Sequence, residues 1–289
     1  MKNFNKVLAA MSTREEDKKI AGYLDFLSPL LGIREVCNFH VFASEYLYEE
    51  LNEYSPGKGI EFIKTIEKNM AEQMDGIYRH ISKKTNEVAV GRPLHELKNK
   101  TETWGADLIA LGKPEKGHST LAKKVVRHIG TNVLVVPDGA DIKLGHILVP
   151  VDLSEHSGKV LRTALDLQEK AGDEVKITCL NIFDVPMLPI YNTFASEARF
   201  GEYVRAQNQK AFDKFIDQYA GEDKHRLECV LLEEVIDRPS QYILEYINEN
   251  DVDFVVMGTH SHSAFDAFLG SNVERVLTEN NKTPLLLVK

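Results

Sequence analysis

The sequence has little of what would place it in several specialised classes of protein. It contains three cysteines in 289 residues: Cys37, Cys179 and Cys229. They lie far apart and form no C-x-x-C pair, which predicts buried, reduced, structural thiols rather than a disulfide framework or a zinc site. No apolar run approaches the roughly 18 residues of a membrane span. The N-terminus also lacks the long apolar segment typical of a secretory signal.

Positive charge is scarce as well. Lys and Arg number 35 against 44 Asp and Glu, which gives a net charge of −9. Proteins that bind nucleic acid or an anionic membrane normally present a basic surface, so this balance argues against both partners. The 43% hydrophobic and 27% charged content is typical of a globular chain and excludes extensive disorder. We therefore expect a cytoplasmic protein whose length corresponds to about two domains.

An internal repeat supports two domains. Three pairs of segments match in the same order: 6–9 with 146–149, 92–112 with 238–258, and 133–136 with 285–288. The offset between the copies grows along the chain, so the second copy carries insertions. We assign residues 1–138 to the first domain and 144–289 to the second, joined by the turn-rich stretch Pro137–Asp141.

Strand and helix patterns alternate within each copy. The first copy has expected strands at 6–11, 34–42, 86–90, 107–111 and 132–136, and the second at 147–151, 175–183, 227–235, 254–257 and 285–288. The strands are short, nearly all-apolar runs, as expected for strands buried on both faces. This order predicts an α/β fold of two tandem, doubly wound, Rossmann-like domains, each with a five-stranded parallel sheet and helices on both faces. Each copy ends in an apolar strand that would be an exposed edge, so we expect these two strands to pack together in an intramolecular pseudo-dimer. The chain could also form a homodimer.

Two segments of the second copy carry residues suited to binding a ligand at the carboxyl edge of the sheet. Asp152 follows the first strand directly. Further on, the Gly258 loop is followed by Gly270 and Ser271 at the start of a predicted helix (270–279). A glycine, a loop of small residues and a helix N-terminus together favour an anion, because unpaired N–H groups and the helix dipole both point toward it.

The two copies resemble the universal stress protein domain, and the whole chain resembles a tandem member of that family. The nucleotide-binding branch of the family has G-x-x-G, nine residues, then G-[S/T]. The second copy has Gly258, then Ser261 where the second glycine belongs, then eight residues (262–269) before Gly270-Ser271. The resemblance implies an adenine nucleotide as ligand, either ATP or a smaller one, with or without Mg²⁺. The binding residues that it implies are Pro150, Asp152, Ile182, Met257, Gly258, His260, Ser261, Gly270, Ser271 and Asn272.

The first copy lacks parts of this pattern. Ser12 stands where the second copy has Asp152, and the loop from Gly112 to Thr120 is five residues shorter than the loop from Gly258 to Ser271. A shorter loop cannot wrap a triphosphate in the same way. We therefore expect the first domain to be structural and without a nucleotide.

Several alternatives remain open on the sequence alone. His260, His262 and Asp266 could share a metal ion, although a solvated polar loop explains them as simply. No nucleophile-elbow motif or paired carboxylates accompany the phosphate loop, which favours a stress-response binding or signalling protein over an enzyme. Slow ATP hydrolysis and a ligand-free interaction scaffold are the competing functions. The apolar segment Pro186–Tyr191 could be a lid or a contact surface.

Overall fold

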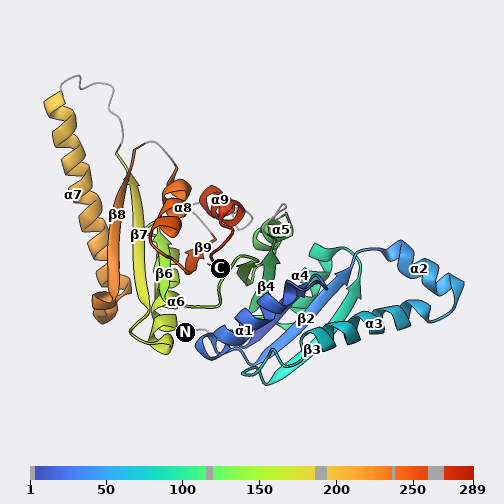
Figure 1. The fold of residues 1–289 in the computed structure, drawn as a ribbon. Helices are drawn as coiled ribbons and strands as arrows, with labels where there is room; N and C mark the ends of the chain where they lie inside the picture. The colour runs from blue at the N-terminus through green and yellow to red at the C-terminus, as the bar shows by residue number, and fades with distance from the viewer. Residues whose placement is uncertain (1–3, 115–119, 186–193, 236–237, 260–269) are drawn as a thin grey trace. The chain divides into compact units, whose positions relative to one another are not determined.

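The structure is a computed structural model (Figure 1). It describes residues 4–114, 120–185, 194–235, 238–259 and 270–289, and for residues 194–198 it describes the backbone alone. The chain divides into two compact units. The N-terminal unit contains Lys2–Ile142 together with Asn281–Lys289, and the C-terminal unit contains Lys143–Asn280. Each unit is described by itself below.

The N-terminal unit is an α/β sandwich with a mixed sheet. Its elements are β1 (Lys6–Met11), α1 (Asp17–Leu31), β2 (Glu35–Phe42), α2 (Glu45–Tyr54), α3 (Lys58–Gln73), β3 (Lys83–Val90), α4 (Pro93–Trp104), β4 (Leu108–Lys113), α5 (Thr120–His128), β5 (Asn132–Pro137) and β10 (Leu285–Val288). The strand order is β3-β2-β1-β4-β5-β10. The first five strands run parallel, as the sequence predicts, and β10 is antiparallel to β5.

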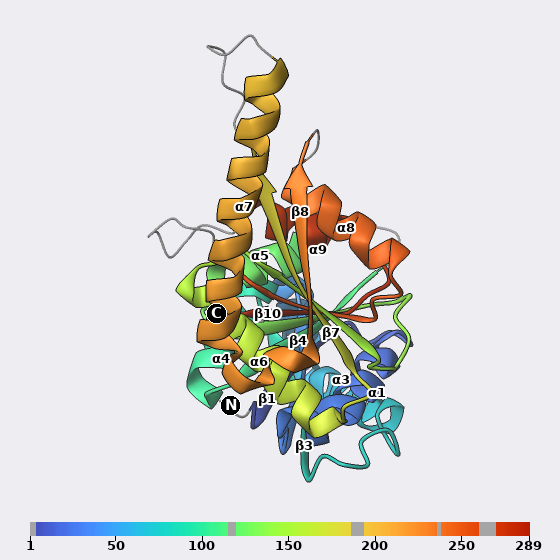
Figure 2. The ribbon, with the colours of Figure 1, turned by 90° about the vertical axis from the view of Figure 1, so that its left-hand side faces the viewer.

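The C-terminal unit repeats this plan. Its elements are β6 (His146–Val151), α6 (Glu155–Ala171), β7 (Lys176–Asp184), α7 (Phe194–Tyr219), a 3₁₀ turn (Gly221–Arg226), β8 (Leu227–Glu234), α8 (Pro239–Glu249), β9 (Phe254–Gly258) and α9 (Ser271–Glu279). The strand order is β9-β6-β7-β8, with β6 and β7 each parallel to its neighbours on both sides. Figures 1 and 2 both show the long helix α7 running beside β8.

Local sequence signals explain where several helices begin and end. The hydroxyl of Ser154 accepts the N–H of Ser157 at 3.1 Å and so caps the N-terminus of α6. Pro93 and Pro239 open α4 and α8, where a missing N–H has no cost. Gly32 ends α1 with φ 75°, a left-handed conformation that glycine adopts without strain.

Each unit has its own core of strand and helix side chains. Leu8, Ile109 and Leu134 are fully buried in the N-terminal unit, and Leu148 and Phe254 are fully buried in the C-terminal unit. Strands with both faces covered need such apolar runs. No helix in the described ranges has the length and apolar character needed to cross a bilayer.

The last strands of the two sequence copies pair with each other, as predicted from their exposed apolar edges. Leu286 lies opposite Leu134, with Leu285 opposite Val135 and Leu287 opposite Val133. Leu286 and Leu287 are fully buried. The C-terminal nine residues therefore belong to the N-terminal unit, although the repeat assigns them to the second copy.

Candidate functional site

The predicted nucleotide residues of the second copy that the structure describes are spread around one edge of the C-terminal sheet. Val151, at the end of β6, lies opposite Asn181 on β7, and Leu148 lies opposite Val255 on β9. The carboxyl ends of these strands therefore meet at one edge. Pro150, Asp152, Ile182 and Gly258 are half-buried there. Because β6 has β7 on one side and β9 on the other, this edge is the switch point where α/β sheets bind ligands.

Asp152 is held firmly by its own loop. Its Oδ1 accepts the N–H of Ser154 at 3.1 Å and also the hydroxyl of Ser157. The Ser157 hydroxyl in turn accepts the N–H of Asp152 at 3.2 Å. Leu153, between them, has φ 61°, which makes the turn tight. The chain thus fixes a carboxylate at the end of β6 before any ligand is present.

Gly258 lies against His156, which is not among the predicted site residues. A Cβ built on Gly258 would lie 2.6 Å from Cδ2 of His156, so any larger residue here would have to displace this imidazole. His156 lies in the first turn of α6, two residues after Ser154. The sequence does contain a signal for His156. A histidine in the first turn of a helix that follows a strand directly lies near the carboxyl edge of the sheet.

Helix α9 begins at the same segment of the sequence where the phosphate loop was predicted to end. Gly270 is buried, Ser271 is exposed, and no side chain caps this N-terminus among the described residues. Asn272 differs from the expectation in one respect: its Oδ1 accepts the N–H of Ser240 at 3.2 Å, so its side chain ties α9 to α8. The backbone N–H of Asn272 and the Nδ2 donors of its side chain are not used by this contact.

Other predicted positions are core residues or lie outside the described residues. Met257 is 5% exposed and packs in the core of the sheet. His260 and Ser261 lie outside the described residues, as do His262, Asp266 and the segment 186–191. Within the described ranges, no three His, Cys, Asp or Glu side chains gather in a way that could hold a metal ion.

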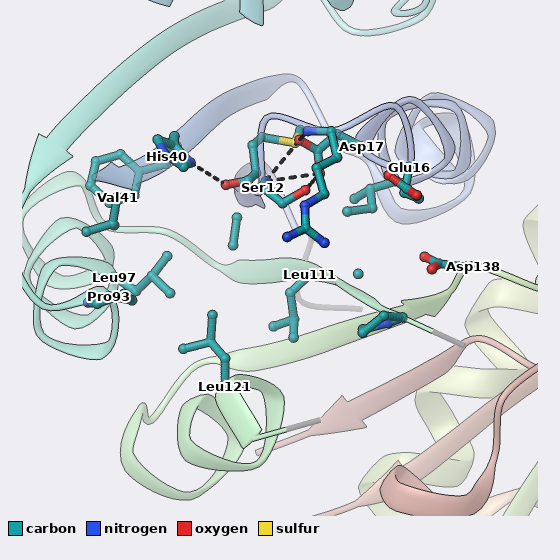
Figure 3. Close-up of a pocket in the computed structure, with 17 residues that line it drawn as sticks. Ser12, Glu16, Asp17, His40, Val41, Pro93, Leu97, Leu111, Leu121 and Asp138 are labelled. Carbon is teal, nitrogen blue, oxygen red and sulfur yellow. Dashed lines mark hydrogen bonds between the residues drawn. The ribbon is translucent and has the colours of Figure 1, made fainter. Parts of the chain in front are cut away.

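The N-terminal unit has a cavity at the corresponding edge of its own sheet. It has a volume of about 340 Å³ and lies at the carboxyl ends of β1, β2 and β4. Figure 3 shows Leu97 of α4, Leu111 of β4 and Leu121 of α5 lining it, with Ser12, Asp17 and His40 on the polar side. Its volume and largely apolar lining fit a small ligand. The absence of a nucleotide from this half stays a prediction.

The two halves build the same loop with their carboxylate and hydroxyl exchanged. In the N-terminal unit, buried Asp17 accepts the N–H groups of Ser12 and Thr13 at 2.9 and 2.7 Å, and the Ser12 hydroxyl at 2.9 Å. Ser12 corresponds to Asp152, and Asp17 to Ser157. Thr13 has φ 65°, like its counterpart Leu153. The sequence comparison found no carboxylate at Ser12, because the carboxylate comes from five residues further along.

A second polar contact is common to both halves. His40 on β2 donates its Nδ1–H to the carbonyl of Met11 at 2.9 Å, and Asn181 on β7 donates its Nδ2–H to the carbonyl of Val151 at 2.9 Å. Each contact fixes the last residue of the central strand. His40 also lines the cavity.

Comparisons with known proteins agree with this architecture. The model of the universal stress protein family matches residues 143–289, which is just over half of the chain. The chain belongs to the universal stress protein family. The fold of the whole chain is similar to that of a universal stress protein from Archaeoglobus fulgidus DSM 4304, with a TM-score of 0.68. The two sequences are 16% identical, and the match covers 99% of this chain and 97% of that chain. It is also similar to a functionally unknown protein from Pseudomonas aeruginosa PAO1, at 15% identity and a TM-score of 0.62, with 99% and 92% covered.

At these identities, the two structures support the shared fold alone. Both cover nearly the full length of this chain, so the tandem arrangement is part of the shared fold. No curated protein matches the chain.

Proposed function

We propose that this universal stress protein is a stress-response binding protein that holds an adenine nucleotide in its C-terminal unit. The observation that carries the proposal is the immobilised carboxylate of Asp152 at the switch point of the sheet. A carboxylate held by Ser154 and Ser157 can accept hydrogen bonds from the ribose hydroxyls or the base without having to be ordered first. Family membership supports the choice of ligand.

The N-terminus of α9 would bind the phosphates. Its first-turn N–H groups have no side-chain cap among the described residues, and helix N-termini favour anions. Gly270 immediately precedes these groups as the N-cap of α9, and under this proposal a bulky side chain there would compete with the phosphates. His156 lies beside Gly258 at the same sheet edge and would contact the sugar or the phosphates.

Isothermal titration calorimetry with ATP, ADP and AMP, each with and without Mg²⁺, tests this proposal. Asp152→Asn keeps an oxygen that can accept from Ser154 and Ser157 but removes the charge. Losing one charge-assisted contact should weaken binding by roughly ten- to a hundredfold. Gly270→Val should abolish binding. Thr120→Ala, at the start of α5 in the other half, is the matched control and should bind like the wild type.

Absence of binding by the wild type at millimolar nucleotide would contradict the proposal, and so would unchanged affinity in Asp152→Asn. Incubation with ATP followed by product analysis separates binding from slow hydrolysis.

A second candidate is ligand binding in the N-terminal cavity, which is favoured by its volume of about 340 Å³. The cavity is near the small end of the range for ligand pockets. Its lining combines apolar side chains with polar ones such as Ser12 and His40, which suits a small, mainly apolar ligand that carries a polar group. Val41→Trp would fill the cavity. A ligand whose binding is lost in Val41→Trp and retained in Asp152→Asn would belong to this site.

A further inference from the structure

Two of the three cysteines lie directly opposite each other on neighbouring strands of the C-terminal unit. In the parallel pairing of β7 with β8, Cys179 is the register partner of Cys229. Cys179 and Cys229 are far apart along the chain but not in the fold. Cys37 and Cys179 are buried as predicted, whereas Cys229 is exposed, so the prediction of a buried thiol is wrong for Cys229.

The strand geometry brings the two thiols within reach of a disulfide bond. Neighbouring strands lie about 4.8 Å apart, and a disulfide needs Cα atoms roughly 4.4–6.8 Å apart. Register partners project from the same face of a sheet. The adjacent pair shows that side chains meet across these strands, because Thr178 donates its hydroxyl to Glu228 at 3.0 Å. Among the described strands, β8 ends the order of the sheet and pairs with β7 alone, so it is free to move on its other side.

The surroundings of Cys229 determine how fast it reacts. Although Cys229 is exposed as a residue, partial burial of its thiol raises the pKa, and the carboxylates of Asp213 on α7 and Glu228 on β8 raise it further. Burial also raises the pKa of Cys179. Since the thiolate is the nucleophile, exchange at these cysteines should be slow at neutral pH and faster at alkaline pH. Such a pair would respond to sustained oxidation rather than to brief oxidation.

We propose that Cys179 and Cys229 form a reversible disulfide by exchange with a low-molecular-weight disulfide, at a site separate from the nucleotide site. The Cys229 thiolate attacks one sulfur of the small disulfide, which forms a mixed disulfide and releases one small thiolate that takes up a proton. The Cys179 thiolate then attacks the Cys229 sulfur and releases the second small thiol. The two protein thiols lose two electrons and two protons, and the small disulfide is reduced to two thiols.

This bond would tie β7 to β8 and close the loop that contains α7. Cross-linking two residues that are distant in sequence restricts the unfolded chain, so the oxidised protein should be more resistant to unfolding. Reduction would restore the original state. The closed loop begins and ends on strands, so the bond requires no change in the strand pairing.

The test uses the full reduced chain, oxidised glutathione at mildly alkaline pH, and intact-mass analysis with non-reducing peptide mapping. The wild type should lose two hydrogens and yield one linked peptide pair containing Cys179 and Cys229. Cys179→Ala should stop as a glutathione adduct at Cys229, and Cys229→Ala should stay unmodified. Cys37→Ala, which removes the thiol outside the pair, is the matched control and should behave like the wild type.

Thermal unfolding provides a readout independent of the variants. The oxidised wild type should unfold at a higher temperature than the reduced protein, and dithiothreitol should reverse the shift. The proposal is overturned if the wild type accumulates the same stable glutathione adduct as Cys179→Ala. It is equally overturned if Cys229 remains unmodified, or if Cys37 appears in the linked peptide.

Discussion

Exchanging Ser12 and Asp17 tests whether the two halves share one loop design. The carboxylate of Asp17, 2% exposed, accepts N–H groups from Ser12, Thr13 and Arg14 at 2.9, 2.7 and 3.3 Å, and the Ser12 hydroxyl at 2.9 Å. Hydrogen bonds to a charged group contribute about 1.5–3 kcal/mol each. Residues 12–14 are exposed, so water can hydrogen-bond to their N–H groups and offset part of this loss in stability. Asp17→Ala should therefore destabilise the N-terminal unit by about 3 kcal/mol.

The double variant Ser12→Asp/Asp17→Ser reproduces the arrangement of Asp152 and Ser157. Alone, Ser12→Asp puts a second carboxylate against Asp17, and repulsion at this separation costs on the order of 2–4 kcal/mol. In the double variant, the serine hydroxyl at position 17 can accept the N–H of residue 12, as Ser157 accepts that of Asp152. We expect the double variant to lie within about 1 kcal/mol of the wild type, and thus to be more stable than Ser12→Asp.

Urea unfolding followed by tryptophan fluorescence measures this directly. Trp104 is the single tryptophan and lies in α4, so its signal reports on the N-terminal unit. The midpoints should shift while the dependence on urea concentration stays the same. If the double variant is no more stable than Ser12→Asp, the loops are not equivalent and the shared design is refuted.

Three further predictions follow from individual contacts. Leu286→Ala, which removes a fully buried side chain opposite Leu134, should destabilise the N-terminal unit by about 2–5 kcal/mol in the same fluorescence assay, and an unchanged midpoint would exclude the pairing of β10 with β5. Burial lowers the pKa of His146 below 6.5, so the unfolded chain binds the proton more readily than the folded chain. The free energy of unfolding should therefore fall as the pH drops below about 6.5. Calorimetric unfolding should show this fall in the wild type and a flatter pH profile in His146→Gln. Gly258→Ala should displace the His156 ring and weaken nucleotide binding at least severalfold by titration calorimetry, whereas wild-type affinity would show that the ring has room to move.

The alternation of apolar strands and amphipathic helices was enough to predict the fold. Short apolar runs such as Ile147–Val151 predicted strands that the structure contains. Pro239 was predicted to lie at the start of a helix, and α8 begins there. The pairing of the last two strands followed from their apolar edges. These features are local or repeat along the chain, so they are visible in sequence.

Contacts that depend on how strands and loops are aligned in three dimensions could not be predicted from the sequence. The carboxylate of Asp17 replaces that of Asp152 from a different position, which a residue-by-residue comparison of the repeats overlooks. The pairing of Cys179 with Cys229 depends on the register of β7 and β8, which no local pattern specifies. The N-terminal cavity arises from side chains of several elements that meet only in the folded unit.

Hydrogen–deuterium exchange of the full chain with and without ATP tests the central claim most directly, because it locates the ligand as well as detecting it. A nucleotide held by Asp152 and the N-terminus of α9 should slow exchange at the N–H groups of 152–157 and 270–273, and leave 11–17 and 39–41 unchanged. Slowed exchange confined to 11–17 and 39–41 would place the ligand in the N-terminal cavity. That result, or no change anywhere at millimolar ATP, would contradict a nucleotide site in the C-terminal unit.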